Sequence, residues 1–378
     1  MPSFAFEYLE GGSEDELSLR GNRQALESLD LIPRTLVDTS QRHQRVEILG
    51  RMAGAPLVIA PTGLNGMLHP EGDIALARAA ARFGIPYSLS TVSTSRIEDV
   101  GVHAAGGRLW MQLYLFKDRG IGQDIMKRAA AAGFEALIFT TDANVFGSRE
   151  WDKRNYRLPG KPTVRAKLDT LRHPEWLLSL LLRNGVPRFK NLEKFLPPDA
   201  ASAVGASTII PGLYEPKLTW EDIAWLREHW SQKLLIKGLL SAVDAERAAA
   251  LGVDGIVVTN HGGRQLDSCV APIEVLPEIA RAVGKRLTVL VDSGFRRGTD
   301  VVKALALGAN AVLLGRATLY GLAAGGEPGV QRALEILTTE IDRVIGQLGC
   351  RSVADLGPQF VRRRSFCIDA VQRGSELI

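Results

Sequence analysis

Eight short apolar runs, separated by segments with helical periodicity, constrain the fold of this chain more than any other feature. A short run that is apolar throughout is typical of a strand buried on both faces. Most of the intervening segments are Ala-rich and repeat their apolar residues at helical spacing, as in 73–83 and 242–251. Strands that alternate with helices predict a parallel sheet, and eight of them favour one (β/α)8 TIM barrel over a doubly wound sheet. The runs lie at 57–60, 87–89, 109–113, 136–140, 234–236, 255–258, 287–291 and 311–314.

The composition is typical of one globular domain, which we expect to span residues 1–378. The chain has 46% hydrophobic residues and 46 Lys and Arg against 42 Asp and Glu, so a nucleic-acid partner is not expected. Cys269, Cys350 and Cys367 are scattered, which predicts neither a disulfide framework nor a metal site and favours a reducing, cytoplasmic compartment. No apolar stretch approaches the roughly 20 residues that cross a bilayer.

One long excursion, 143–218, interrupts the alternation after the fourth run. It contains no clear strand and helix unit, which usually indicates a functional excursion or a mobile loop. Its part 161–194 holds eight Lys and Arg against three acidic residues, around the apolar run 176–182. That run could lie in a bilayer interface, or it could be a helix packed on the barrel or on a neighbouring subunit.

Polar, cationic or glycine residues follow all eight runs, at the end where barrels place their active sites. We therefore expect these residues to converge on one mouth. In chain order they are Pro61, Thr62, Gly63, Ser90, Gln112, Tyr114, Thr140, Asp142, Lys237, His261, Asp292, Ser293, Gly294, Gly315 and Arg316.

The segment 259–267 after the sixth run carries the most chemistry. His261 can move a proton near neutral pH, and Arg264 is a fixed cation able to hold a carboxylate. Gly262 and Gly263 let the backbone approach a flat ligand closely. The segment predicts a proton carrier beside a carboxylate clamp.

Segments 292–300 and 314–316 together predict a phosphate site. Each follows a run and leads into a helix, and they combine glycines with Arg296 and Arg316. Helix N-termini with an arginine bind anions, and barrels often place a phosphate after strands seven and eight. Each glycine alone is more often a turn residue, but the combination favours the phosphate site.

Four further polar residues have a structural explanation as well as a functional one. Lys237 closes a buried run, where its amine would either meet an anion or a Schiff-base carbonyl, or extend to solvent. Tyr114 could be a hydrogen-bonded core phenol, Asp142 a cap for the next segment, and Arg149 a solvated surface charge. The residues alone leave these alternatives open.

The motifs in this order resemble those of the FMN-dependent (S)-2-hydroxy acid dehydrogenases and oxidases, and most of all their bacterial mandelate dehydrogenase branch. The resemblance covers nearly the whole chain, and the set is far more specific than any one motif. The motifs are 6–15, 61–66, 112–114, 141–142, 237–241, the His261 segment, 292–300 and 315–316.

The resemblance implies a role for each candidate. The substrate carboxylate would lie between Arg149 and Arg264, assisted by the Tyr8 hydroxyl. His261 would take a proton from the substrate, with Asp142 orienting the ring. In addition, Tyr114 would hydrogen-bond the substrate hydroxyl, and Lys237 would lie at the pyrimidine edge of the flavin.

The resemblance also implies one FMN and no adenine site. The residues around the flavin ring would be Pro61, Thr62, Gly63, Ser90, Gln112, Thr140 and Lys237. Those near the ribityl chain and phosphate would be Asp292, Ser293, Gly294, Arg296, Gly315 and Arg316.

Two positions indicate the electron acceptor and the substrate. Gly63 stands where many oxidases of the family have Ala, which implies poor reactivity with oxygen and another acceptor such as a quinone. Val92 stands where members acting on small acids often carry a bulky aromatic residue, so the pocket has room for an aryl group such as that of mandelate.

The branch further implies attachment to the inner face of the cell membrane through 161–194, electron transfer to the respiratory chain, and a homotetramer. The alternatives are an (S)-lactate dehydrogenase or an oxidase that uses oxygen. More remote are a Schiff-base aldolase through Lys237, an FMN-dependent isomerase and a non-catalytic membrane-bound barrel.

Overall fold

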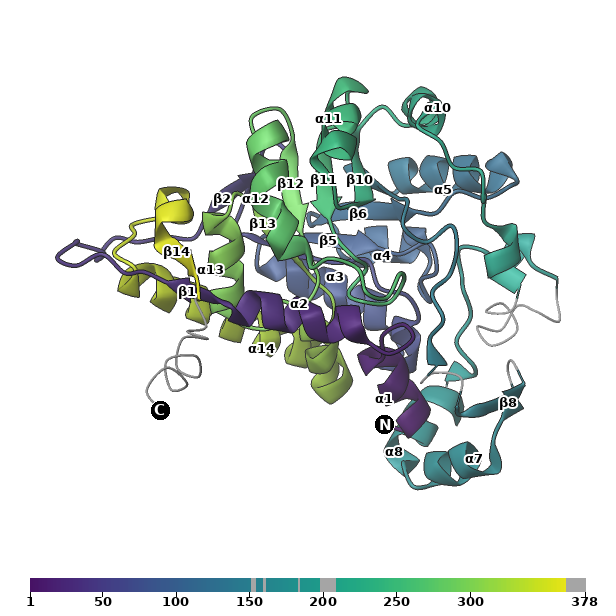
Figure 1. Cartoon of the computed structure of the whole chain (residues 1–378). Helices are drawn as coiled ribbons and strands as arrows, with labels where there is room; N and C mark the ends of the chain where they lie inside the picture. Colours follow the sequence, from purple (N-terminus) through teal and green to yellow (C-terminus); the bar gives the residue numbers. More distant parts are fainter. Residues whose placement is uncertain (151–153, 159–160, 183, 198–208, 365–378) are drawn as a thin grey trace, which may run out of the picture.

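Eight parallel strands close into a barrel at the centre of the molecule (Figure 1). The computed structural model describes residues 1–150, 154–158, 161–182, 184–197 and 209–364. Each strand pairs with the next along the chain, and the last pairs with the first through Val312 and Leu57. This closure confirms the predicted (β/α)8 barrel and excludes the doubly wound sheet. The strands are β4 (Leu57–Ile59), β5 (Pro86–Leu89), β6 (Arg108–Leu113), β7 (Ala136–Thr140), β10 (Lys233–Leu239), β11 (Gly255–Val258), β12 (Thr288–Val291) and β13 (Ala311–Leu314).

Side chains along each strand alternate between the barrel interior and the layer beneath the helices. In β4, Val58 packs inside the barrel, whereas Leu57 and Ile59 pack outward. The hairpin of β2 (Val46–Ile48) and β3 (Arg51–Ala53) joins the interior cluster at the end where β6 begins. The barrel is therefore a filled core that is closed at its amino-terminal end.

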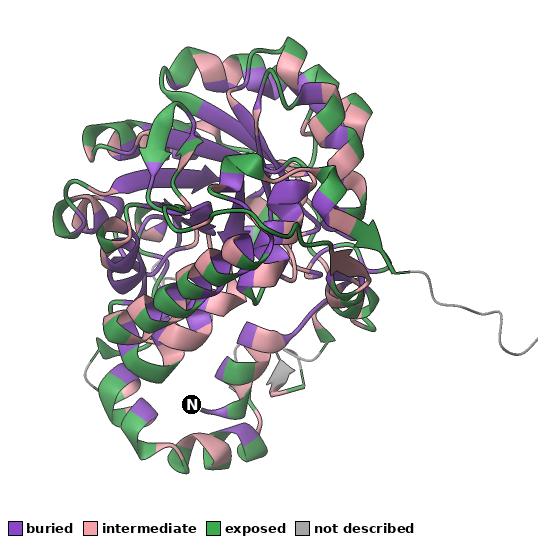
Figure 2. Ribbon diagram, turned by 90° about the vertical axis from the view of Figure 1, so that its left-hand side faces the viewer, coloured by how far each residue is buried: buried purple, intermediate pink, exposed green. Residues whose placement is uncertain are grey.

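A ring of helices covers the barrel, with buried faces toward the strands and exposed faces toward solvent (Figure 2). The last of them is broken at Gly325 and Gly326, where the backbone leaves helical geometry. A side chain on Gly326, whose φ is +61°, would collide with the imidazole of His69. The helices are α3 (Gly72–Arg82), α4 (Ile97–His103), α5 (Arg119–Ala131), α10 (Glu221–His229), α11 (Ala242–Ala250), α12 (Pro272–Val283), α13 (Gly298–Ala306) and α14 (Arg316–Gln347).

The N-terminal segment lies against the carboxyl ends of the barrel strands. It forms α1 (Ser3–Glu10) and α2 (Leu17–Glu27), and its backbone bonds to the His261 segment, as from Ser13 N–H to the Gly263 carbonyl at 2.8 Å. Beyond α2, β1 (Leu29–Leu31) pairs antiparallel with β14 (Val361–Arg363).

The excursion contains more regular structure than its sequence predicts. Its elements are β8 (Tyr156–Leu158), β9 (Lys161–Pro162), α7 (Val164–Leu171), α8 (Pro174–Trp176), a π-helix (Leu177–Leu182) and a 3-10 helix (Glu193–Phe195). The Trp176 ring meets Phe4 of α1 edge to face at 5.5 Å between ring centres, and its Nε1–H donates to the Met67 carbonyl at 2.9 Å. Leu180 is also buried. One side of the apolar run therefore packs on the protein itself. No helix in the part of the chain described combines the length and apolar character needed to span a bilayer.

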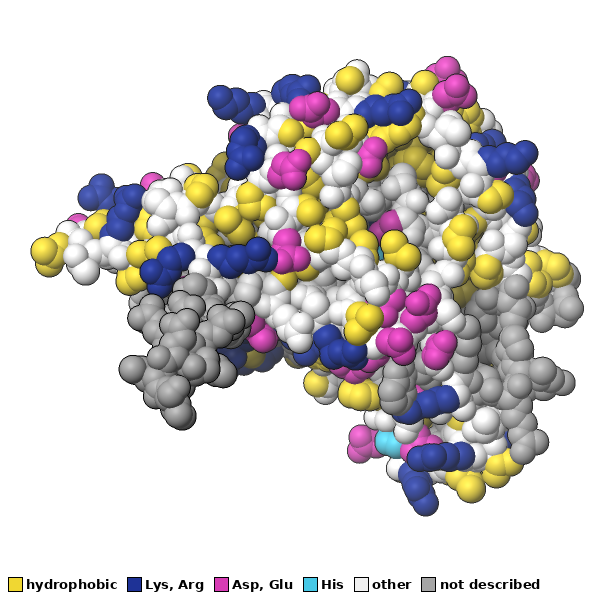
Figure 3. Space-filling view, in the orientation of Figure 1, with side chains coloured by type: hydrophobic (Ala, Val, Ile, Leu, Met, Phe, Trp, Pro, Cys, Tyr) yellow, Lys and Arg dark blue, Asp and Glu magenta, His cyan; other side chains and the backbone are white. Residues whose placement is uncertain are grey.

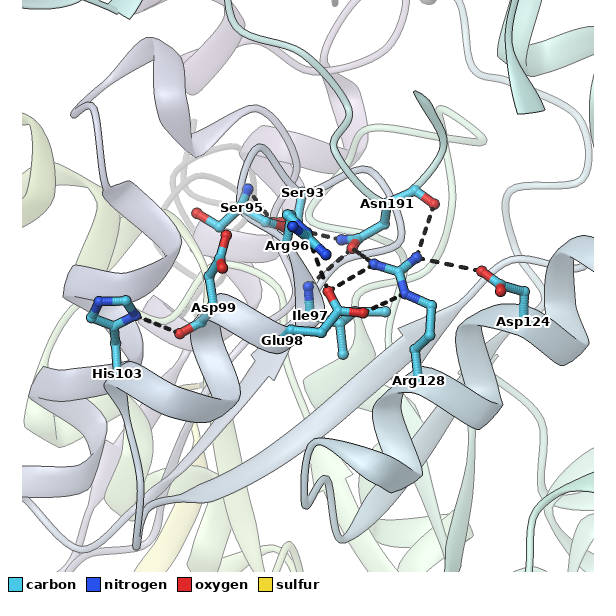
Figure 4. A network of polar contacts seen from close by, with 10 residues as sticks. All are labelled: Ser93, Ser95, Arg96, Ile97, Glu98, Asp99, His103, Asp124, Arg128 and Asn191. Carbon is cyan, nitrogen blue, oxygen red and sulfur yellow. Dashed lines mark hydrogen bonds and ion pairs between the residues drawn. The ribbon is translucent and has the colours of Figure 1, made fainter. Parts of the chain in front are cut away.

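A polar network fastens the far end of the excursion to the barrel helices (Figure 4). Arg128 of α5 donates two hydrogen bonds to Glu98 of α4, at 2.6 and 2.9 Å, and a third to Asn191 Oδ1 at 3.1 Å. Asn191, which is 1% exposed, also donates to the Ser95 carbonyl at 3.0 Å. Because Asn191 bonds both to Arg128 of α5 and to Ser95, this part of the excursion lies beside the loop that carries Val92.

Candidate active site

A cleft of about 860 Å³ opens at the mouth of the barrel and brings most of the predicted site residues together. Three predicted residues do not line it. Asp142 lies behind His261, while Gln112 lies behind Ser90 and donates to Thr140 Oγ1 at 3.1 Å. The predicted residues that line the cleft are Tyr8, Pro61, Thr62, Gly63, Ser90, Tyr114, Arg149, Lys237, His261, Arg264, Asp292, Ser293, Gly294, Arg296, Gly315 and Arg316.

His261 and Asp142 form a hydrogen-bonded pair in the wall of the cleft. They follow β11 and β7, and Nδ1 of His261 lies 2.9 Å from Oδ1 of Asp142. Burial lowers the pKa of His261 in spite of the neighbouring carboxylate, so the imidazole is neutral at neutral pH. Burial opposes ionisation of Asp142, but its interactions with His261 and Lys237 hold its pKa below the usual carboxyl value. A neutral imidazole backed by a carboxylate is suited to accept a proton.

Lys237 brings an amine with unused donors to the cleft. Its side chain is 4% exposed, and Nζ lies 3.7 Å from Oδ2 of Asp292. Among the described residues this Nζ has no hydrogen-bond partner. A buried amine in that state is unfavourable unless a ligand supplies acceptors. The pyrimidine edge of a flavin, with its carbonyl oxygens, would supply them.

Two guanidinium groups lie against one tyrosine ring. The Cζ atoms of Arg264 and Arg149 lie 5.1 and 5.8 Å from the centre of the Tyr8 ring. Arg264 is held by a 2.6 Å hydrogen bond from Nη1 to the Gly11 carbonyl. Two such cations on one side of a cleft can fix the plane of a carboxylate.

Tyr114 borders the same region. Its ring lies 4.8 Å from that of Tyr214, and its pKa is raised by burial and by the charge of Asp142. The phenol therefore stays protonated and can donate a hydrogen bond. If Tyr114 were only a hydrogen-bonded phenol of the core, its place in the lining of the cleft would be unexplained.

The loops that carry Gly63 and Val92 are joined by one buried carboxylate. Asp73 of α3 accepts from Asn65 Nδ2 at 2.7 Å and from the Ser93 hydroxyl at 2.7 Å. Its side chain is inaccessible to solvent. Sequence reasoning did not identify Asp73, because an acidic residue in the first turn of a helix is common on any surface.

Segment 314–316, one of the two segments that together predict a phosphate site, leads into α14. Gly315 precedes this helix without a side-chain cap and lines the cleft, and a Cβ there would meet open space, so a ligand can approach the helix start closely. Arg316 donates to three backbone carbonyls, those of Leu9, Gly11 and Gly262, at 2.9 to 3.0 Å. By contrast, Arg296 lies 3.8 Å from Glu10 and its side chain is 42% exposed. Arg316 is thus fixed in place, whereas Arg296 can turn toward a phosphate.

The excursion supplies one part of the apolar lining of the cleft, and sequence reasoning did not identify it. The rings of Phe146 and Tyr214 stack at 5.3 Å between centres, next to Phe189, Ile210 and Pro211. These residues belong to no motif. The unusual length of the excursion was the only signal that pointed to them.

Within the described ranges, no three His, Cys, Asp or Glu side chains are grouped to hold a metal ion. Cys269 and Cys350 are free thiols, and Cys367 lies outside the described residues.

Comparison with known proteins agrees with these features. Residues 1–363 match the family described as FMN-dependent dehydrogenase. The chain is 46% identical to (S)-mandelate dehydrogenase of Pseudomonas putida, over 96% of this chain and 90% of that protein. It is 42% identical to a putative L-lactate dehydrogenase of Mycobacterium tuberculosis, over 95% and 85% of the two chains.

A solved structure leads to the same family. The crystal structure of the monotopic membrane protein (S)-mandelate dehydrogenase superposes with a TM-score of 0.91 at 45% identity, covering 96% of this chain and 95% of the other. The orphaned amine of Lys237 and the open helix start at Gly315 fit the ring and the phosphate of FMN. The chain belongs to the FMN-dependent dehydrogenase family, and its cofactor is FMN.

Proposed function

We propose that this protein oxidises an (S)-2-hydroxy acid with an aryl side chain, of the mandelate type, to the 2-oxo acid. FMN-dependent oxidation of a 2-hydroxy acid is the activity common to its relatives. The observation that carries the proposal is that His261, backed by Asp142, lines the same cleft as Arg149, Arg264 and Tyr8.

In this proposal the chain's own groups bind and orient the acid. Arg149, Arg264 and Tyr8 hold the carboxylate, and Tyr114 donates to the hydroxyl or its oxygen as charge develops there. His261 takes the proton released from the substrate, and Asp142 stabilises the imidazolium. The oxidation removes two electrons and two protons from the acid; His261 takes one proton, and FMN, when bound, would supply the acceptor for the two electrons and the second proton. Lys237 would lie beside its ring and stabilise negative charge there.

The aryl preference is supported by the walls of the cleft. The Tyr214 ring stacks on Phe146 and packs at a tilt against Tyr114, and these rings can meet an aromatic substituent at its face or edge. Val92 lines the cleft beside Gly63, and a bulkier residue at position 92 would take up part of the cleft. The alternative substrate is lactate, which a related protein is named for.

Anaerobic reduction of the flavin by (S)-mandelate, (S)-lactate and glycolate, followed by stopped-flow absorbance, tests the substrate. We expect the highest ratio of reduction rate to dissociation constant for mandelate. Reoxidation by oxygen and by a soluble quinone tests the acceptor, and quinone is expected to be faster. If the protein prefers lactate or oxygen, the substrate part or the acceptor part of the proposal is wrong. If none of the three acids reduces the flavin, the whole proposal is rejected.

We also propose that the excursion docks on the inner face of the cell membrane. The apolar residues Val164, Leu168 and Leu171 follow each other at helical spacing on α7 and are 61%, 55% and 64% exposed. Leu178 and Leu182 add a second exposed pair. Figure 3 shows Lys and Arg side chains beside hydrophobic ones at the α7 end of the molecule. An apolar stripe bordered by basic residues matches an anionic bilayer surface.

Flotation with anionic vesicles tests this docking. Deleting 161–194 would also remove buried Phe189 and Asn191, so substitution is the cleaner design. We expect replacement of Val164, Leu168 and Leu171 by serine to release the protein into the soluble fraction, while Val102→Ser with Val243→Ser, at exposed apolar sites elsewhere, leaves it bound. Equal flotation of both variants would reject the docking surface. The homotetramer stays a prediction that light scattering can measure.

A further inference from the structure

The His261 segment has three consecutive residues in the left-handed region of the backbone. The φ angles of His261, Gly262 and Gly263 are +59°, +67° and +73°. This region is unfavourable for a residue with a side chain, so contacts around His261 must hold it there. The direction of the imidazole depends on those contacts.

Each backbone N–H of these three residues donates to a side chain. His261 N–H donates to Thr259 Oγ1 at 2.9 Å and Gly262 N–H to Ser293 Oγ at 3.0 Å. Gly263 N–H donates both to Asn260 Oδ1, at 3.2 Å, and to the Asn260 carbonyl, at 3.1 Å. The Thr259 and Ser293 hydroxyls both bond to Asp292, within the cofactor side of the cleft. Asn260 instead faces the N-terminal helices.

Asn260 and Asn22 of α2 form a reciprocal carboxamide pair. Asn22 Nδ2 donates to Asn260 Oδ1 at 2.9 Å, and Asn260 Nδ2 donates to Asn22 Oδ1 at 2.7 Å. Both residues are buried, with exposures of 1% and 5%. Asn260 Nδ2 also donates to the Val270 carbonyl at 3.2 Å. Asn260 therefore accepts twice and donates twice, which only a carboxamide side chain can do in this arrangement.

Neither asparagine is among the residues that line the cleft, so any effect they have on the reaction must pass through the segment they hold. We infer that Asn22 and Asn260 are positioning residues that keep the His261 segment left-handed, with His261 against Asp142 and Arg264 against Tyr8. The inference rests on the proposed role of His261. It makes Asn22 of α2, which is 238 residues away from Asn260 in sequence, part of the machinery that orients the base.

The test compares Asn22→Ala with Leu26→Ala, both FMN-loaded. Asn22→Ala removes both bonds between Asn22 and Asn260 and leaves those from Leu17 and Ser18 of α2 to Asp267. Leu26, four residues on, is buried in the apolar core. In anaerobic reduction by (S)-mandelate, we expect Asn22→Ala to lower the limiting rate about tenfold to hundredfold, because small misplacement of a base has effects of that size. FMN content should be unchanged. Leu26→Ala should lose thermal stability and keep the parental rate.

The pH profile separates positioning from general weakening. The groups whose charges act on His261 are Asp142, Lys237 and Asp292, and burial outweighs them in lowering its pKa. A relaxed segment admits water to the imidazole, so the acid limb of the rate profile should move to higher pH in Asn22→Ala and stay in place in Leu26→Ala. If the alanine variant does not retain FMN, Asn22→Ser, which leaves a hydroxyl in the same space, takes its place. It should show the same changes in rate and pH profile more weakly.

A parental rate and pH profile in the FMN-loaded Asn22 variants would overturn the positioning role. If substrate reduces the parent protein and the Asn22 variants have the same rate and pH profile, the positioning role is wrong and the proposed function stands. If the parent is reduced by none of (S)-mandelate, (S)-lactate or glycolate, the proposed function fails and the role of the pair fails with it.

Discussion

A Cβ atom placed on Gly63 would lie 2.7 Å from Cγ2 of Val92. Two positions therefore share a wall of the cleft: Gly63, which the resemblance associates with the electron acceptor, and Val92, which it associates with the substrate. The size of each side chain limits the size of the other. Asp73 strengthens this relationship, because its carboxylate joins the two loops.

Gly63→Ala should lower the free energy of unfolding of the FMN-loaded protein by about 1–3 kcal/mol, because Val92 must shift to admit the methyl group. Val92→Ala should remove the conflict, so that the double variant is more stable than the two separate effects predict. Urea unfolding of the four proteins measures this coupling. Additive effects would show that the two side chains do not compete.

His261→Ala should retain FMN and lose reduction of the flavin by substrate, by about 10²- to 10⁴-fold, since a positioned base contributes that much. Stopped-flow absorbance measures the loss. Chemical reduction by dithionite is the control and should be unaffected. A variant reduced by the acid at the parental rate would remove His261 from the role of base.

Arg264→Met should chiefly weaken binding of the substrate carboxylate, because it removes one of the two guanidinium groups beside Tyr8. Loss of a charge-assisted hydrogen bond of about 1.5–3 kcal/mol corresponds to roughly tenfold to a hundredfold in the dissociation constant. Titration with a non-reacting 2-oxo acid, followed by the flavin spectrum, measures it. Unchanged affinity would contradict the assignment.

The rate of flavin reduction should depend on pH through His261. The base acts in its neutral form, and burial places its pKa below the ordinary imidazole value of about 6.5. The rate should therefore be constant at neutral pH and fall only once the pH drops below about 6.5. An acid limb above that value would show that the imidazole is not desolvated in the working enzyme.

Glu98 should contribute to acid stability. Hydrogen bonds from Arg128 lower its pKa to about 2, below the unperturbed 4.5. Because the folded pKa is the lower one, the stabilisation is present above pH 4.5 and is lost as the pH falls toward 2. Glu98→Gln should therefore reduce thermal stability at neutral pH and flatten its decline in acid, unlike Glu47→Gln at an exposed site. If the thermal stability of both variants and of the parent fell in parallel as the pH is lowered, the Glu98–Arg128 interaction would not stabilise the fold.

Much of the barrel could be predicted because a strand buried on both faces must be an apolar run, and all eight such runs coincide with barrel strands. The candidate residues could be proposed because barrel geometry places strand ends at one mouth. The excursion could not be read in the same way. Trp176 and Leu180 pack inward while Leu178 and Leu182 point outward, a division that an unbroken apolar run conceals.

The sequence by itself determined the alternation of strands and helices, and with it the neighbourhood of His261, Asp142 and Lys237, since local periodicity and strand order decide both. Only the tertiary structure decided which groups surround them. The stacking of Tyr214 on Phe146, the three carbonyl partners of Arg316 and the pairing of Asn22 with Asn260 join residues far apart in the chain. Such contacts depend on how loops and helices close over the barrel, and no local pattern in the sequence encodes that closure.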